Sequence, residues 1–492
     1  MRNVLGFLAF LVGVSLAAGI WAQERPEVRK NVRQLFFDDY LIDSVSGLTR
    51  TLHRPVKHPD NPVLKREHPW EALRIQVYGT VLYDPAEQLF KIWYLNIAKS
   101  SAEKITVMGQ RRLGHATLLS YATSRDGLRW NKPPLGIVDF EGSTANNMIG
   151  PDFYNPEGFS VLYEPHDPLP ERHYKAFYWD HGRGPTVLWK GREIYGEGKD
   201  DGIHVAFSSD GIHWKPFAGN PVLKFYSDTG QCVLYDPSLK KYVAFGRFNA
   251  GGRKVARTES ADFIHWSVPK LVLAPDTRDG PNTQFYGISV DWYNGLYIGV
   301  LWMFQIEEGN VGRIDMQLCH SRDGKTWVRD PERRVWLPNG PAGAWDAGDM
   351  RAACRSVILP DRMLFYYAGS PAKHGQGGPG RLGMDIGLAT LRRDGWVSWD
   401  AAQTGTLLTK PFIHPGGELV LNADAAAGSV VAEFLDGEGK PLSEPCVSLP
   451  LRENAIASRP VFAESLGATL AGRTVRLKLT LTRAALYALW FE

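Results

Sequence analysis

The sequence predicts an all-β protein, a five-bladed β-propeller followed by a C-terminal β-sandwich. A short turn motif recurs five times along the chain, and paired strand patterns precede each copy. Internal repetition of this kind is typical of propellers and solenoids. The composition agrees, because 50 Gly, 32 Pro and 16 Trp among 492 residues suit short strands and many turns better than long helices.

The turn motif has the pattern S-x-D-G-x-x-W. Four copies occupy residues 124–130, 208–214, 260–266 (where Phe263 replaces the glycine) and 321–327, and a degenerate fifth occupies residues 393–396. An Asp-Gly pair between two alternating runs is a strong hairpin signal, because glycine tolerates the positive φ of a tight turn. The repeated aspartates are therefore interpreted as turn residues, not as catalytic or calcium-binding groups: Asp126, Asp210, Asp262, Asp323 and Asp394.

A second pair of strand patterns lies before each turn, in residues 77–94, 159–179, 232–245, 286–300 and 353–367. Each repeat then holds four short strands, and four-stranded units repeated around an axis form the blades of a propeller. A row of independent hairpins is the alternative, but isolated hairpins cannot bury their apolar faces. Five repeats therefore predict five blades.

Three segments follow from these patterns. Residues 1–22 resemble a signal peptide, with Arg2, an apolar stretch over residues 4–18 and small residues up to Ala22, so we expect export to the periplasm or medium. Residues 23–401 are expected to form the propeller. Residues 402–492 no longer carry the repeat but keep strand-like alternation, which favours a β-sandwich.

The charge pattern limits the partners. The formal net charge is +3 and no basic run stands out, so nucleic acid is not expected as a partner. No second membrane candidate follows the first segment, and no membrane association is expected after signal removal. No cofactor is expected; a structural calcium ion in the axial channel is an alternative that no string of ligands supports.

The turn motif and three further segments, residues 36–42, 58–64 and 387–393, resemble the glycoside hydrolase superfamily of five-bladed propellers. This superfamily includes the invertase-type proteins of family 32, with a propeller and a C-terminal sandwich, and their family 43 and family 130 relatives. The resemblance implies activity on carbohydrate. The invertase motif W-M-N-D-P-N is absent, and residues 69–74 read P-W-E-A-L-R instead. Candidate site residues therefore come from topology.

Topology predicts where a site would lie. The innermost strands of a propeller all run the same way, so the segments that enter them meet the loops between second and third strands at one end of the axis. The catalytic candidates there are Asp228, Glu71, Asp346 and Asp349, and the substrate-binding candidates are Trp70, Arg74, Asp152, Arg247, Tyr286, Trp345, Arg351 and His374. We expect Asp228 to stay ionised beside Arg247, with a more buried carboxyl as proton donor.

Carboxylates, arginines and aromatic rings are the set that glycoside cleavage requires. The sequence therefore predicts an exo-acting glycoside hydrolase that cleaves oligosaccharides derived from plant or algal polysaccharide. Two alternatives stay open: a glycan-binding propeller without catalysis, and a glycoside phosphorylase. The expected partner in each case is an oligosaccharide or polysaccharide.

Overall fold

The computed structural model describes residues 25–100, 102–181, 186–189, 192–196, 198–376 and 383–492. The predicted signal peptide, residues 1–22, lies outside them. Regular structure in the described residues is almost entirely β, with one short α-helix, α1 (Leu466–Leu470), and two 3₁₀ turns, η1 (Pro69–Glu71) and η2 (Pro170–Arg172). The all-β prediction is confirmed. No helix in the described part of the chain is long and apolar enough to cross a membrane.

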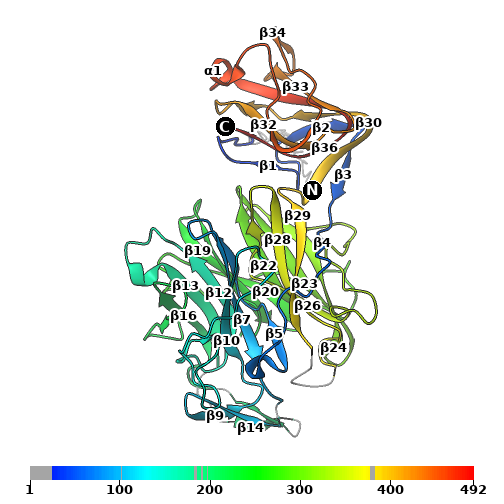
Figure 1. The fold of residues 1–492 in the computed structure, drawn as a ribbon. Helices are drawn as coiled ribbons and strands as arrows, with labels where there is room; N and C mark the ends of the chain where they lie inside the picture. The colour runs from blue at the N-terminus through cyan, green and yellow to red at the C-terminus, as the bar shows by residue number, and fades with distance from the viewer. Residues whose placement is uncertain (1–24, 101, 182–185, 190–191, 197, 377–382) are drawn as a thin grey trace, which may run out of the picture.

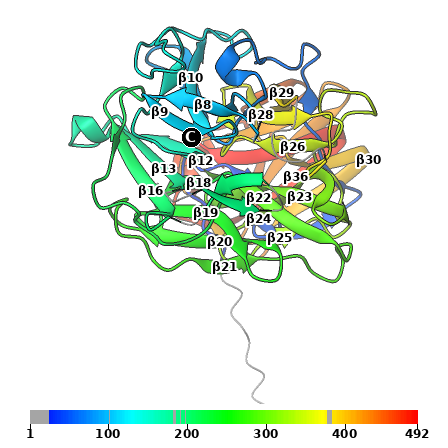
Figure 2. The ribbon, with the colours of Figure 1, turned by 90° about the horizontal axis from the view of Figure 1, so that it is seen from below.

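Most described strands between Val56 and Arg392 pair in five consecutive antiparallel groups, or blades, arranged around one axis (Figure 2). A single parallel bridge, Ile314 to Asp349, links the fourth and fifth groups, and two further hairpins pair separately. The members of the five groups, from the axis outwards, are β5 (Arg74–Gln76) and β6 (Val81–Asp84), β7 (Leu89–Ile97), β10 (Leu118–Ser124), β11 (Met148–Ile149); β12 (Pro156–Tyr163), β13 (Tyr174–Asp180), β16 (Gly202–Ser208), β17 (Lys215–Pro216); β18 (Cys232–Asp236), β19 (Lys241–Asn249), β20 (Arg253–Ser260), β21 (Lys270–Leu273); β22 (Thr283–Tyr293), β23 (Leu296–Glu308), β24 (Val311–Ser321), β25 (Val328–Arg329); and β26 (Asp349–Ala352) and β27 (Val357–Ile358), β28 (Arg362–Ser370), β29 (Asp385–Arg392), β4 (Val56–Lys57).

The fifth blade takes its outer strand from the other end of the propeller sequence. Strand β4 pairs antiparallel with β29, with Lys57 opposite Ala389 and Val56 opposite Thr390. The chain thus closes the ring of blades by hydrogen bonds between its early and late segments.

The repeated turns hold themselves together by side-chain hydrogen bonds. In the second copy, Asp210 Oδ1 accepts from the backbone N–H groups of Ile212 and His213, each at 2.8 Å, and Ser208 Oγ accepts from Gly211 N at 2.9 Å. Gly211 has φ +76°, as the tight turn requires. The turn also docks on the preceding blade, because the Trp93 indole donates to Gly211 O at 2.6 Å. Asp126, Asp262 and Asp323 accept the equivalent bonds, which give these four aspartates the structural role that the sequence predicts. Asp394 differs, because it accepts from Arg33, Tyr293 and Asn422.

The terminal sandwich contains more of the chain than the expected 402–492. It consists of β30 (Val397–Thr409), β31 (Phe412–Ile413), β32 (Leu419–Asp424), β33 (Ser429–Asp436), β34 (Pro441–Val447), β35 (Asn454–Ser458) and β36 (Thr474–Phe491), joined by β1 (Gln34–Leu35), β2 (Ile42–Ser46) and β3 (Thr49–Leu52). The N-terminal strands pair with β30 and β36. Residues 34–52 therefore differ from the expected division, because their strands pair with β30 and β36 and not with the strands of the blades.

The two ends of the propeller axis differ (Figure 1). The terminal sandwich stacks on one end, the sandwich end, where Arg33 pairs with Asp394 at 2.6 Å. The opposite end, the open end, carries two added hairpins, β8 (Lys104–Val107) with β9 (Gln110–Leu113) and β14 (Thr186–Trp189) with β15 (Arg192–Tyr195). The segments that enter the inner strands also reach this open end.

Candidate functional site

A cluster of charged side chains lies at the open end of the axis. Every blade contributes at least one member through its inner strand or the residues just before it: Arg74, Gln76, Glu157, Asp228, Tyr286, Asp349 and Arg351. Figure 2 views this end, with β12, β18, β22 and β26 near the centre. Backbone hydrogen bonds between inner strands close the axis below the cluster, from Phe159 N to Tyr78 O (2.8 Å) and from Cys354 N to Gly79 O (2.9 Å).

Asp228 is held by a buried arginine. Arg247, on β19, forms an ion pair with Asp228 Oδ1 through Nη1. The same guanidinium donates to Tyr286 O through Nε and Nη2, at 3.3 and 3.0 Å, which fixes its plane. The Asp228 side chain is 36% exposed, whereas that of Arg247 is 3% exposed. The buried Arg247 therefore orients the Asp228 carboxylate from inside the propeller, and the carboxylate is accessible from the open end.

Glu157 is brought beside Asp228 by a close approach of two backbones. Gly158, with φ +65°, follows Glu157, and a Cβ there would lie 2.1 Å from Thr229 O and 2.5 Å from Gln231 N. Only glycine allows β12 to pass so near the chain that follows Asp228. Glu157 Oε1 accepts a hydrogen bond from Thr117 Oγ1 at 3.0 Å.

Burial raises the pKa of Glu157 to about 7; Arg74 opposes this shift and the negative charge of Asp228 adds to it. A carboxyl with this pKa is protonated in a large fraction of molecules at neutral pH. The open end thus places an acid able to donate a proton beside an ion-paired carboxylate.

Asp349 has a different environment. Arg351 donates to both of its oxygens, from Nε to Oδ1 at 3.0 Å and from Nη2 to Oδ2 at 2.7 Å. His374 Nδ1 lies 3.6 Å from Oδ2. Burial would raise the pKa of Asp349, but Arg351 and His374 outweigh burial and lower it. Asp349 therefore stays ionised and positions Arg351, with no surface open to a substrate.

Two aromatic side chains complete the cluster. The Tyr286 ring packs against the guanidinium carbons of Arg247 and Arg351, at 4.4 and 5.0 Å from its centroid. Burial would raise the pKa of Tyr286, but Arg351 and Arg247 lower it. Tyr226, two residues before Asp228, is 52% exposed and sits edge-on to Trp179. Its free face is a surface on which a sugar ring can stack.

Three other candidates from blade one and its flank do not join the cluster. Glu71 is fully buried and accepts hydrogen bonds from Tyr94 OH at 2.6 Å and Lys132 Nζ at 2.8 Å. Trp70 stacks on His68, and its indole donates to Asn147 at 2.9 Å. Asp152 is exposed on the loop between β11 and β12.

Two further candidates belong to the fifth blade's outer contacts. Asp346 is buried, pairs with Lys57 and accepts from Tyr367 OH at 2.9 Å. Trp345 stacks on Tyr367 with ring centroids 5.4 Å apart. Of the four catalytic candidates, the structure brings Asp228 and Asp349 to the axis and places Glu71 and Asp346 in buried ion pairs elsewhere. Lys132 pairs with Glu71, and Lys57 pairs with Asp346. Strand patterns do not predict these contacts, because both lysines are distant in sequence from their partners.

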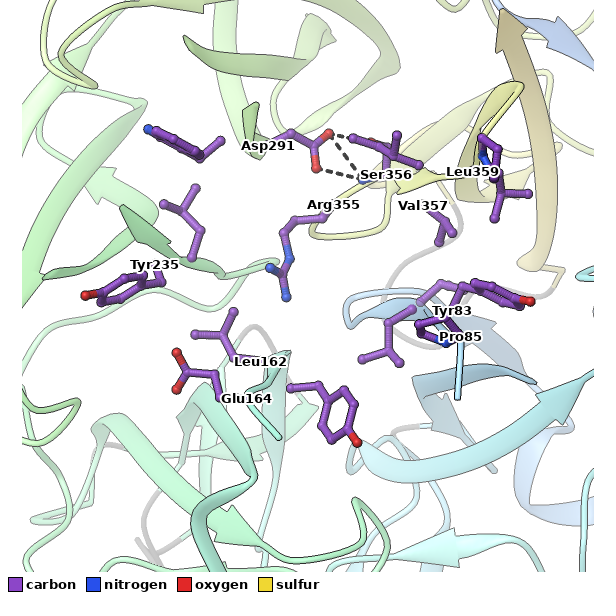
Figure 3. A pocket seen from close by; sticks show the side chains of 17 residues that line it. Tyr83, Pro85, Leu162, Glu164, Tyr235, Asp291, Arg355, Ser356, Val357 and Leu359 are labelled. Atoms are coloured by element: carbon purple, nitrogen blue, oxygen red, sulfur yellow. Dashed lines mark hydrogen bonds between the residues drawn. The ribbon is translucent and has the colours of Figure 1, made fainter. Parts of the chain in front are cut away.

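A cavity of about 650 Å³ lies at the sandwich end of the axis (Figure 3). The Arg355 side chain points into its centre and donates to Val161 O at 2.7 Å. Asp291 accepts from Ser356 Oγ at 2.6 Å, and burial raises the pKa of Asp291 to about 6. Most of the remaining lining is apolar or aromatic. This cavity has one carboxyl with a raised pKa, and a second carboxylate of its lining, Glu164, pairs with Lys175 and accepts a hydrogen bond from Tyr242 OH.

Among the described residues, no three His, Cys, Asp or Glu side chains are grouped so that they could hold a metal ion.

Comparisons with known proteins give structural likeness only. No protein-family model matches the chain, and no curated protein matches it. Among solved structures, a β-1,2-mannobiose phosphorylase from Listeria innocua is 10% identical with a TM-score of 0.46, over 68% of this chain and 96% of that one. A glycosyl hydrolase from Bacteroides ovatus is 14% identical with a TM-score of 0.44, over 69% and 94%. An N-acetylgalactosamine deacetylase from F. plautii, in complex with blood group B trisaccharide, is 14% identical with a TM-score of 0.40, over 76% and 96%.

Proposed function

We propose that this chain is a glycoside hydrolase whose reaction takes place at the open end of the axis. Glu157 is the proton donor to the leaving oxygen, and Asp228 is the carboxylate that acts as base or nucleophile. The observation that carries this proposal is the pair itself: a carboxyl with its pKa raised to about 7 lies beside an accessible carboxylate paired with Arg247. Glycoside cleavage uses two carboxyl groups in these two states.

The remaining members of the cluster have supporting roles. Arg247 orients Asp228, and Asp349 orients Arg351, so both guanidiniums face the reacting centre in fixed planes. The exposed ring of Tyr226 offers a stacking surface next to Asp228. A rigid arrangement of this kind lowers the barrier by holding the substrate in one orientation.

The closed axis supports exo action. Hydrogen bonds between inner strands close the axis below the cluster, as between Val290 N and Cys354 O at 3.1 Å. On the open side, the β8–β9 and β14–β15 hairpins are joined through an ion pair between Lys104 and Glu193 and extend past the end of the propeller (Figure 1). A site reached from one end suits the terminus of an oligosaccharide.

The test compares leaving groups. Glu157→Gln is expected to lower turnover of oligosaccharides on the order of 10³-fold, because proton donation is lost. The same variant should keep most activity on aryl glycosides with an acidic phenol, which departs without a proton. Asp228→Asn should lose activity on both substrate types. A panel of aryl glycosides and oligosaccharides assayed with the wild type supplies the substrates.

The contrary outcomes are specific. Equal loss on both leaving groups in Glu157→Gln would remove Glu157 as the donor. If the wild-type protein binds oligosaccharides in titration calorimetry but cleaves none of them, a glycan-binding propeller replaces the enzyme.

A further inference from the structure

Strand β5 and the residues after it present three polar side chains to the axis, at alternate positions. These are Arg74, Gln76 and Tyr78, and the intervening Ile75 and Val77 lie in the apolar core between blades. The alternation follows from the strand period of two. Gln76 and Tyr78 are 1% and 2% exposed. Side chains buried in this way normally have hydrogen-bond partners.

Each of the three carries a donor that no described residue satisfies. Arg74 Nε, Gln76 Nε2 and Tyr78 OH are all buried without a hydrogen-bond partner among the described residues. The Gln76 amide cannot be turned round, because its oxygen accepts from Arg351 Nη1 at 3.1 Å and a guanidinium only donates. Its NH₂ group must therefore face away from Arg351. Three unmet donors in a row call for a ligand that accepts hydrogen bonds.

The charges of the cluster point to an anion. Asp228 and Asp349 pair with Arg247 and Arg351, whereas Arg74 forms no ion pair within 4 Å with any described residue. Burial and then the nearby Arg351 lower the pKa of Arg74, and Glu157 offsets them only in part, so the positive charge of Arg74 is not fully balanced. A negative group bound there would balance it.

Arg253 adds a second unbalanced charge. Its guanidinium donates to two neutral groups, Gln284 Oε1 at 2.8 Å and Asn310 Oδ1 at 3.1 Å, and packs over the Tyr286 ring at 5.3 Å. It too forms no ion pair with a described residue. The carboxyl groups that act on these two arginines are Glu157, partly protonated at neutral pH, on Arg74, and Asp228, already paired with Arg247, on Arg253.

We propose that the axial site selects a sugar that carries an oxyanion substituent, a carboxylate or a sulfate ester. Arg74, Gln76 and Tyr78 bind this group, and Arg253 contributes to its attraction. The inference rests on the proposed function in that the ligand is a glycan, but it concerns binding and not bond cleavage. A guanidinium with adjacent amide and hydroxyl donors matches the several acceptor oxygens of such a group.

The experiment measures binding without turnover. Asp228→Asn protein is titrated calorimetrically with matched oligosaccharide pairs: uronate-terminated against carboxyl-reduced, and sulfated against desulfated. We expect one anionic member to bind at least tenfold more tightly than its neutral counterpart, and the pair that shows the difference identifies the oxyanion. Introducing Arg74→Met into the Asp228→Asn protein should weaken binding of the anionic oligosaccharide at least tenfold and leave binding of the neutral oligosaccharide unchanged.

Two controls keep the result interpretable. Arg74→Lys, which keeps the charge, should recover part of the affinity. Arg362→Met removes an exposed arginine of β28 that pairs with Asp361, and it should change nothing. Equal binding of charged and neutral members, or equal weakening of both by Arg74→Met, overturns the inference. Cleavage of neutral glycans only in the presence of inorganic phosphate would also overturn it, since the arginines would then bind a phosphate co-substrate. Selective anion binding without cleavage would instead remove the proposed hydrolysis and leave this inference standing.

Discussion

Each end of the propeller axis holds a partly buried carboxyl with a raised pKa, and the two ends differ in the groups that surround it. Glu157 at the open end has a pKa of about 7, and Asp291 in the sandwich-end cavity has a pKa of about 6. Asp291 accepts from Ser356 Oγ and backbone N, and Glu164, the other carboxylate of the cavity, pairs with Lys175 and accepts from Tyr242 OH. Glu157 lies beside Asp228 and a row of unmet donors. We therefore base the proposed reaction site on the second carboxylate and the unsatisfied donors, and not on a raised pKa or a large cavity alone.

The largest expected effect is a difference in turnover between a substitution at the open end and the same kind of substitution at the sandwich end. Asp228→Asn should lower the rate by about 10³-fold or more, because the amide cannot act as base or nucleophile. Asp291→Asn makes the same chemical change at the sandwich end and should leave the rate within about twofold of wild type. Steady-state kinetics on the best substrate measures both. A comparable loss in Asp291→Asn would mean that the ends were assigned the wrong way round.

The pH profile gives the next largest effect. Because Glu157 must be protonated to donate, kcat/KM should fall about tenfold per pH unit above pH 7, as its pKa of about 7 implies. Asp291→Asn should keep this alkaline limb. In Glu157→Gln the limb should vanish on substrates with acidic leaving groups. An alkaline limb that persists in Glu157→Gln would belong to another group.

The carboxyl groups with raised pKa at both ends should make the free energy of unfolding depend on pH. Glu157 has a folded pKa near 7 against an ordinary 4.5, so its stabilising contribution is complete below pH 4.5 and lost as pH rises towards 7. The side chain of Glu157→Gln cannot ionise, so the variant does not lose stability as the pH rises. Its free energy of unfolding should therefore exceed that of the wild type by about 2 kcal/mol at pH 8, with little difference at pH 4. Asp291→Asn should act in the same direction, with its change between pH 4 and 6. Urea unfolding at the two pH values tests this; destabilisation of Glu157→Gln at pH 8 contradicts it.

The smallest effect concerns a turn at the sandwich end. Asp210→Ala removes the acceptor for the N–H groups of Ile212 and His213 and should lower stability by about 1 kcal/mol. Turnover per folded molecule should stay unchanged, since the turn lies far from the open end. Thermal unfolding and steady-state kinetics on the same sample measure the two quantities. A large loss of turnover in the folded variant would contradict the structural role of the repeated aspartates.

The repeats predict the strand groups and the roles of the turn residues, because these depend on local sequence. Position before or within an inner strand also suffices to place Asp228, Asp349 and Arg351 at the axis. The proton donor does not follow from position alone. Glu157 lies at the start of an inner strand and is not among the catalytic candidates, because its partnership with Asp228 depends on the approach of Gly158 to Thr229, which precedes the next blade.

Long-range pairing accounts for the remaining differences. Glu71 and Asp346 precede inner strands just as Asp228 does, but Lys132 and Lys57 hold them away from the axis. The two lysines come from segments whose own sequence gives no sign of the contact. The alternation of Arg74, Gln76 and Tyr78 is a signal that the strand pattern contains and that marks the axis-facing side of β5.

The pairing of the N-terminal strands with the terminal sandwich constrains how the chain folds. Gln34 pairs with Leu489, so this part of the sandwich cannot form until the last strand has been synthesised. Contacts between segments so distant in sequence are slow to form and place the sandwich late in folding. Once made, they hold the segment that runs on into β4, the strand that pairs with β29 at the outer edge of the fifth blade. A chain that lost β36 would keep all the strands of its blades but would lack this anchor, and we expect β4 to detach from β29 first during unfolding.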